Sequence, residues 1–200
     1  RVGGGPVALL MTTLGNEFAK YLDLEVLYAG QSFGFEGSRS AGDRLRSHET
    51  LQGILAEALA RSPDMDIWLA MLVFEEPYTF AAIDPAPMVS ATEEEERAHT
   101  AAIFEQGVSI QQQVNLAEAM AIRYFQPPYN TMFRNHFPNP AHKTYDECYK
   151  LDFHSVGIEI PTENLNTRFY SETISPQWVH LHTFPLHSDA ERSALLSIFD

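Results

Sequence analysis

The sequence Leu27-Tyr-Ala-Gly-Gln-Ser32 follows an apolar run that begins at Leu24, and a loop rich in glycine and serine joins it to Asp43-Arg-Leu-Arg-Ser-His48. The apolar run predicts a buried strand, and Gly30 is expected to end it. Asp43 is a suitable N-cap, and a helix would place Arg44 and His48 on one face because they are four residues apart. The stretch is thus expected to bring together a phenol, a guanidinium and an imidazole, which are groups suited to a phosphodiester.

A second stretch, from Asn115 to Asn130, has a helical apolar pattern that two prolines end. Its apolar positions are Leu116, Ala119, Met120, Ile122 and Phe125. Glu118 lies to one side of this face, and a carboxylate at the edge of an apolar face requires a partner or a metal. Pro127 and Pro128 are followed directly by Tyr129 and Asn130.

In this order the motifs resemble those of the GIY-YIG nuclease superfamily. Tyr28-Ala29-Gly30 is similar to the second half of the name motif, with Ala in place of Ile. Arg44 and His48 resemble the catalytic pair on the following helix, and Glu118 resembles the metal-binding glutamate. Pro128-Tyr129-Asn130 is similar to the Pro-x-Asn corner that closes the domain.

The resemblance implies an α+β fold with a small mixed or antiparallel three-stranded sheet flanked by helices. We expect its strands at residues 7–11, 24–28 and 67–74, with a strong helix over 50–60 between them. The GIY-YIG-like core would span residues 1–135, with an insertion around 75–92. Residues 136–200 would form a β-rich extension, because 156–160, 167–170 and 178–184 alternate as strands do.

The resemblance also implies a metal-dependent endonuclease, a phosphodiester hydrolase that acts on nucleic acid, with DNA as the first candidate substrate and RNA as the second. Its catalytic residues would be Tyr28, Arg44, His48 and Glu118, with Glu118 binding Mg²⁺ or Mn²⁺. His48 would take the proton from the attacking water, and Tyr28 would donate a hydrogen bond. The substrate would be bound by Arg39, Arg46 and Arg123. Gly30 and Asn130 would have structural roles.

The first half of the family's name motif has no counterpart in this sequence. Val7 to Met11 contains no tyrosine, and Tyr21 is the only tyrosine before Tyr28. The family's first tyrosine is often assigned the deprotonation of the attacking water. The alternative is therefore a catalytically inactive domain of the same fold that acts as a protein-interaction or nucleic-acid-sensing module.

Charge argues against a general nucleic-acid binder, because 13 Lys and Arg residues face 27 Asp and Glu residues and the formal net charge is −14. Arginines gather only locally, at positions 39, 44 and 46 and at 123 and 134. Tight binding would therefore require another domain or protein that supplies basic surface.

The chain is expected to be a cytoplasmic protein without a membrane partner. No apolar run is long enough to span a bilayer, and the start shows no signal-peptide pattern. The single Cys148 excludes an internal disulfide framework and is expected to be structural rather than reactive.

Two histidine patterns offer other metal sites. His180, His182 and His187 follow an H-x-H-x4-H pattern, which would support a metal-dependent hydrolase, although ordinary surface or half-buried histidines are commoner. Glu96 and His99 have the spacing of a di-metal ligand pair, but no second such pair exists, so a solvated helix face is favoured.

Overall fold

The computed structural model describes part of the chain in detail. The described residues are 23–31, 49–61, 66–72, 92, 94, 97–98, 101, 105, 107–151, 153, 155–165 and 167–186. The chain forms two compact units, one of Arg1–Phe33 with Ala102–Asp200 and the other of Gly34–Ala101. The predicted boundary near residue 135 stays a prediction.

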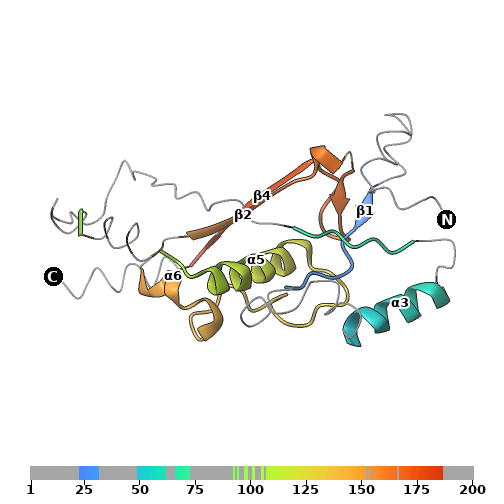
Figure 1. Ribbon diagram of the computed structural model, residues 1–200, viewed down its shortest axis with the longest axis horizontal. Coiled ribbons are helices and arrows are strands. Elements are labelled where there is room, and N and C mark those ends of the chain that lie inside the picture. The colour runs from blue at the N-terminus through green and yellow to red at the C-terminus, as the bar shows by residue number, and fades with distance from the viewer. Residues whose placement is uncertain are drawn as a thin grey trace. The chain divides into compact units, whose positions relative to one another are not determined.

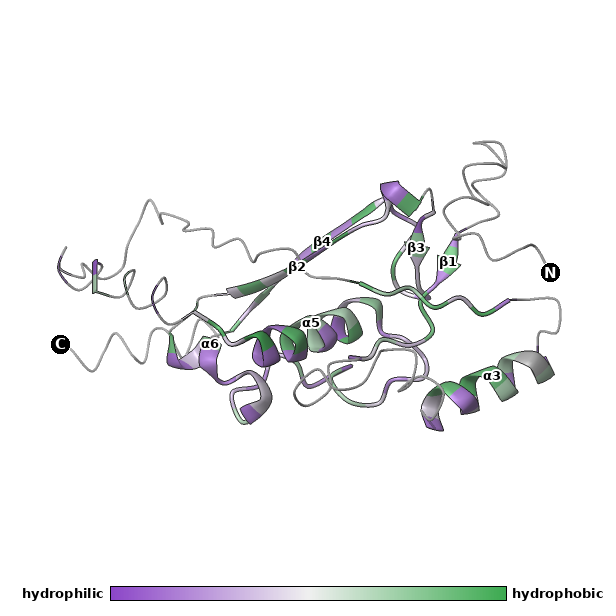
Figure 2. Ribbon diagram, viewed as in Figure 1, coloured by the Kyte–Doolittle hydropathy of each residue, from purple (hydrophilic) through white to green (hydrophobic). Residues whose placement is uncertain are grey.

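Helix α5 (Ile110–Phe125) is the centre of the first unit, and it confirms the helix expected before the two prolines. All five predicted apolar positions are buried, and polar and apolar residues alternate along the helix in Figure 2. Gln126 ends α5 in the left-handed conformation with φ 53°, and its N–H donates to the Ile122 carbonyl. Pro127 follows and cannot extend the helix.

The C-terminal region forms a two-stranded antiparallel ribbon, β2 (Ser155–Pro161) with β4 (Val179–Pro185). These strands confirm two of the three expected there, and Figure 1 shows the ribbon running along α5. Ile158 is opposite His182, and Ile160 is opposite His180. Ile160, His180 and Phe184 are buried, so alternate positions face the helix.

Strand β1 (Leu24–Glu25) pairs in parallel with β3 (Phe169–Tyr170), which is the remaining expected strand of the C-terminal region. The backbone N–H groups of Leu24 and Val26 donate to the carbonyls of Arg168 and Tyr170, both at 2.8 Å. Beyond Val26 the chain leaves this ladder, so β1 is shorter than the strand predicted for 24–28. The suggested partner at 7–11 lies outside the described residues.

A bidentate ion pair holds the beginning of β1. The Arg168 guanidinium donates to both carboxylate oxygens of Asp23, at 2.8 and 2.6 Å. The two residues are 145 positions apart, so the pair joins the first described residue to the C-terminal region. The Trp178 ring lies 5.9 Å from the guanidinium carbon.

The second unit contains α3 (Glu49–Arg61), which confirms the helix predicted for 50–60. Leu51 and Ile54 are buried on one face of it. The strand predicted for 67–74 is wrong where the structure describes it, because residues 66–72 have no regular secondary structure. Trp68, Leu69, Met71 and Leu72 are exposed there, and an apolar run cannot by itself specify a strand partner.

The fold is therefore α+β, as predicted, but the sheets in the described regions have two strands each rather than three. Short helices complete the described elements, namely η3 (Lys143–Tyr145), α6 (Glu147–Lys150) and η4 (Glu163–Leu165). Within the same regions, no helix is long and apolar enough to cross a membrane.

Two hydrophobic clusters unite α5 with the C-terminal elements. The larger contains residues of α5, of the loop and helices after it, and of the end of β4: Leu116, Ala119, Met120, Phe137, Tyr145, Cys148, Phe184 and Leu186. In the smaller, Phe125, Ile160 and Phe169 pack together with Leu24 and Val26 of the β1 segment. The β1 segment is thus anchored beside the end of α5.

Cys148 is fully buried in the larger cluster, and we expect its thiol to be unreactive. Burial, helped by the negative charge of Glu147, raises its pKa to about 11. Modification by a disulfide reagent at pH 8 should be about 100-fold or more slower in the folded protein than in urea, because the thiolate is the reacting form. Equal rates in the two states would contradict a buried thiol.

Candidate functional site

The segment after β1 is held by Asn130, which follows the two prolines at the end of α5. The Ala29 N–H donates to Asn130 Oδ1 at 2.9 Å, and Asn130 Nδ2 donates to the Ala29 carbonyl at 2.8 Å. The Tyr129 N–H donates to the Leu27 carbonyl at 3.2 Å. Asn130 is only 7% exposed, so it replaces water for both backbone groups of a residue 101 positions away.

Glu118 lies beside the same segment. The Gln31 N–H donates to Glu118 Oε1 at 3.3 Å, across 87 positions of sequence. The pKa of Tyr28 is raised by burial and then by the negative charge of Glu118. The Tyr28 hydroxyl therefore stays protonated at neutral pH, where it can donate a hydrogen bond but is a poor base.

Gly30 leaves room for the Tyr28 ring. A Cβ atom at position 30 would lie 2.7 Å from Tyr28 Cε1 and 2.9 Å from its hydroxyl oxygen. These distances are shorter than van der Waals contact, so any larger residue would displace the ring. The absence of a side chain at position 30 thus allows the Tyr28 ring and hydroxyl to take this position.

Glu118 offers one carboxylate as a candidate metal ligand, and its Oε1 also accepts from the Gln31 N–H. Mg²⁺ is commonly bound by one or two carboxylates and completes its shell with water and phosphate oxygens. Across the described ranges, no group of three or more His, Cys, Asp or Glu residues could hold a metal ion. A zinc site with a full set of protein ligands is therefore not formed by these residues, whereas a single carboxylate is compatible with Mg²⁺ or Mn²⁺.

The structure thus brings Tyr28, Gly30, Glu118 and Asn130 together. The predicted residues Arg39, Arg44, Arg46 and His48 lie outside the described residues. Arg123 is described, and its guanidinium donates to the Arg134 carbonyl. On an α-helix, Arg123 is about 140° around the axis from Glu118, so it lies on a different face. Its predicted substrate contact stays a prediction.

Sequence reasoning missed a set of amides near Glu118. Gln111 Nε2 donates to Gln31 Oε1 at 3.4 Å and to Asn115 Oδ1 at 3.1 Å. The one signal in the sequence was the 111-115-118 spacing, which places these residues on one stripe of a helix. Nothing in the sequence indicated that Gln31 would meet this stripe.

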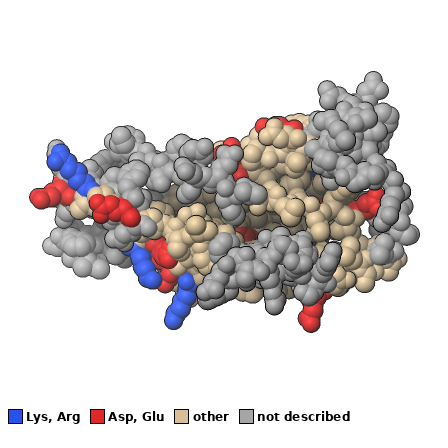
Figure 3. All heavy atoms as spheres, viewed as in Figure 1, with Lys and Arg blue, Asp and Glu red and all other residues tan. Residues whose placement is uncertain are grey.

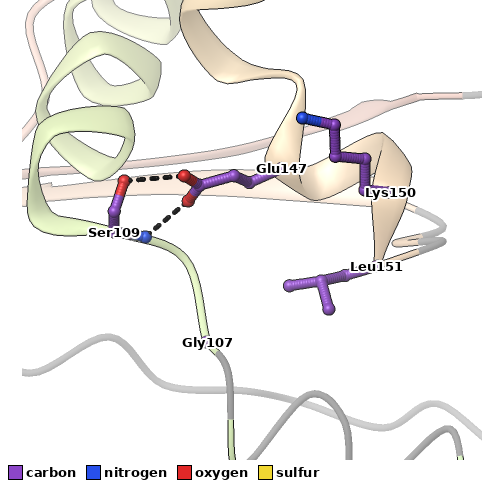
Figure 4. A pocket seen from close by; sticks show the side chains of 5 residues that line it. All are labelled: Gly107, Ser109, Glu147, Lys150 and Leu151. Atoms are coloured by element: carbon purple, nitrogen blue, oxygen red, sulfur yellow. Dashed lines mark hydrogen bonds between the residues drawn. The ribbon is translucent and has the colours of Figure 1, made fainter.

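A hollow at the start of α5 has hydrogen bonds between two of the residues that line it. This hollow of about 310 Å³ is lined by Gly107, Ser109, Glu147, Lys150 and Leu151 (Figure 4). The Glu147 carboxylate accepts from the Ser109 N–H at 2.6 Å and from its hydroxyl at 3.0 Å. Because an acidic group at a helix N-terminus satisfies N–H groups left without helical partners, this arrangement is a cap.

The C-terminal histidines differ in environment. His180 is fully buried, with Nδ1 3.2 Å from the Tyr124 hydroxyl and its ring against Phe125. His182 is exposed, and its ring contacts Tyr124 and Phe184. His180 is thus a core residue rather than an exposed ligand, while His187, Glu96 and His99 lie outside the described residues.

We expect His180 to make folding sensitive to acid. Burial lowers its pKa, and the backbone of Phe169 and Gln177 opposes this only in part. Below the ordinary value near 6.5 the unfolded chain therefore binds more protons than the folded one, and stability falls as the pH falls. Urea unfolding between pH 5 and 7.5 should show this loss.

The control for this prediction is His180→Gln, which has no imidazole to protonate. The loss of stability between pH 7 and 5 should be smaller in this variant than in the wild type. Because both proteins share all other titratable groups, the difference isolates His180. Parallel pH profiles would contradict the assignment.

Charged side chains of both signs lie close together on the face drawn in Figure 3. In Figure 3 the few Lys and Arg side chains described on that face lie near acidic ones and do not form a basic patch. Lys150, for example, pairs with Asp146 at 2.9 Å. This distribution agrees with the acidic composition and provides little attraction for a polyanion.

No protein-family model, curated protein or solved structure matches this chain.

Proposed function

We propose that the protein is a metal-dependent nuclease of the GIY-YIG type that hydrolyses phosphodiester bonds of DNA, with RNA as the second candidate. The observation that carries the proposal is the meeting of the 27–31 segment with α5. Glu118 and Asn130 contact Gln31 and Ala29 across 87 and 101 positions of sequence. Four positions that resemble the family's motifs, Tyr28, Gly30, Glu118 and Asn130, therefore lie on or beside one segment. Motifs matched by chance would have no reason to lie close together in the fold.

In this proposal each of the described site residues has a separate role. Glu118 holds the metal ion, Mg²⁺ or Mn²⁺, which when bound supplies Lewis-acid stabilisation of charge on the phosphate oxygens. Tyr28, protonated because its pKa is raised, donates a hydrogen bond to a phosphate oxygen. Asn130 and Gly30 fix the backbone and the space that determine where this hydroxyl lies.

The remaining roles belong to Arg123 of α5 and to residues that precede α3 in the sequence. Arg44 would neutralise the charge that grows on the phosphate in the transition state, because a guanidinium stays charged and can bind two oxygens at once. His48 would take the proton from the attacking water, since its ordinary pKa is near neutral. Arg39, Arg46 and Arg123 would contact the nucleic-acid backbone.

The proposal includes the finer fold and setting. Residues 7–11 and the β1 segment would belong to a GIY-YIG-like core, the protein would act in the cytoplasm, and another protein or domain would supply basic surface. This additional basic surface is needed because contacts of Lys and Arg with phosphates provide most of the non-specific affinity for nucleic acid.

Removal of the metal tests the proposal directly. We expect the protein to nick plasmid DNA in Mg²⁺ or Mn²⁺ and to lose this activity in a chelator, because a lone carboxylate cannot replace the cation at the phosphate. A gel assay of plasmid and of a structured RNA measures both substrates. Cleavage that persists in the chelator would contradict the metal dependence.

A catalytically inactive module is the second candidate, and two observations favour it. The upstream tyrosine of the name motif is missing, and the net charge is −14. This candidate predicts binding to a protein or nucleic acid without strand cleavage under any divalent metal. Binding without cleavage by both the wild type and Glu118→Ala would favour it over the nuclease, whereas equal cleavage by both would remove Glu118 from catalysis.

A further inference from the structure

A row of uncharged amides lies beside Glu118. Gln31 contributes twice, since its N–H donates to Glu118 Oε1 at 3.3 Å and its side-chain Oε1 accepts from Gln111 Nε2 at 3.4 Å. Gln111 Nε2 also donates to Asn115 Oδ1 at 3.1 Å. Asn115 Nδ2 in turn donates to the Thr144 carbonyl at 2.7 Å. The row therefore begins at a backbone carbonyl and ends at the carboxylate.

Each amide in this row orients the next. The Thr144 carbonyl can only accept, so the Asn115 nitrogen faces it and the Asn115 oxygen faces Gln111. The Gln111 nitrogen then lies between two acceptors, and the Gln31 oxygen faces it. Because an amide oxygen has two lone pairs and an amide nitrogen two hydrogens, Gln31 can keep this bond while it binds a ligand.

A phosphate would use only half of such an amide. Phosphate oxygens only accept hydrogen bonds, so a phosphate would engage the amide nitrogen of Gln31 and leave its oxygen without a ligand donor. No Lys or Arg belongs to the row of Gln31, Gln111, Asn115 and Glu118. The row therefore suits a neutral partner that both donates and accepts.

The edge of adenine in the major groove presents a donor at N6 next to an acceptor at N7, which Gln or Asn pairs with through two hydrogen bonds. We infer that Gln31 reads an adenine close to the cleaved bond, with Gln111 as the residue that positions it. This inference rests on the proposed nuclease function, since it takes Glu118 as the metal-binding group.

The geometry also limits where the adenine lies. Residues 111 and 118 are about 10 Å apart along α5, which corresponds to about three nucleotides of one DNA strand. The bond between Gln31 and Gln111 is exposed and long, and an exposed amide pair contributes little to folding. Its oxygen can thus accept from a ligand at small cost to the fold.

The experiment is cleavage of a randomised DNA duplex library in Mg²⁺, followed by sequencing of the ends. The wild type should enrich adenine at one position within about three nucleotides of the cut. Gln31→Ala should keep cutting but lose this enrichment by about tenfold, the smaller end of the range for a bidentate base contact. Gln111→Ala should weaken the enrichment in part, because the Gln31 amide loses its orienting donor.

Gln113→Ala is the matched control. Gln113 is two positions from Gln111, so it lies about 200° around the α5 axis from it. Its side chain donates to the Val108 carbonyl at 2.6 Å. Its cleavage pattern should match that of the wild type. A second measurement uses the wild-type protein alone, with 7-deazaadenine at the enriched position, where loss of N7 should slow cutting by about tenfold.

The outcomes separate the two proposals. Unchanged enrichment in Gln31→Ala, or no enrichment in the wild type, overturns the reading role, while cleavage that depends on Glu118 leaves the nuclease proposal in place. An unaffected rate on the 7-deazaadenine substrate also overturns the reading role, even if Gln31→Ala fails to fold. A wild type that cuts no nucleic acid rejects both.

Discussion

Replacing Glu118 with glutamine is expected to lower metal-dependent DNA cleavage by at least about 100-fold, because the amide cannot provide the anionic ligand that Mg²⁺ requires. The unfolding midpoint should change little. Glutamine has nearly the same shape, and its oxygen can still accept the bond from the Gln31 N–H. Plasmid nicking rates and urea unfolding measure the two effects separately.

Glu159→Gln is the matched control, since it makes the same chemical change on an exposed position of β2. It should cleave at the wild-type rate. A Glu118→Gln protein that is folded and as active as this control would remove Glu118 from the mechanism. The pKa of Tyr28 should fall in Glu118→Gln but stay above its ordinary value, because burial, the larger cause of the shift, is unchanged.

Replacing Asn130 with alanine is expected to lower the free energy of unfolding by about 2–4 kcal/mol. The side chain is 7% exposed and bonds to both the N–H and the carbonyl of Ala29. Its removal would leave two backbone groups without these partners, and each carries a desolvation cost. Urea unfolding measures the loss, and cleavage should fall with it because the Tyr28 segment is no longer held.

The control is Asn139→Ala, in which the lost side-chain bond is local and exposed. Asn139 Oδ1 accepts from the Ala141 N–H at 2.9 Å, two residues away. Its substitution should cost less than about 1 kcal/mol. If both asparagine variants lose the same stability, Asn130 does not act as the link between the 27–31 segment and α5.

Elements with a regular local pattern could be predicted from the sequence. The apolar spacing of α5 and its end at two prolines require only neighbouring residues, and the alternation in β2 and β4 likewise specifies strands. The corner asparagine was predicted as structural, and the structure places it against Ala29. Its resemblance to a family motif, rather than its local pattern, indicated this position.

The partners of short apolar runs could not be predicted in this way. Residues 24–28 were expected to form one long strand, but only Leu24 and Glu25 are strand residues, and they pair with β3. The run at 67–72 has no regular structure. An apolar run favours burial or pairing in general, whereas its partner depends on which distant segment approaches it.

The sequence by itself determined the amphipathic helices, the C-terminal strands, the acidic charge and the residue types available for chemistry, because these depend on composition and on neighbours within a few positions. Only the tertiary structure decided that Glu118 lies beside Tyr28 and that Gln31 joins the amides of α5. These contacts link residues 80 or more positions apart, so they form only when packing and hydrogen bonds bring distant segments together.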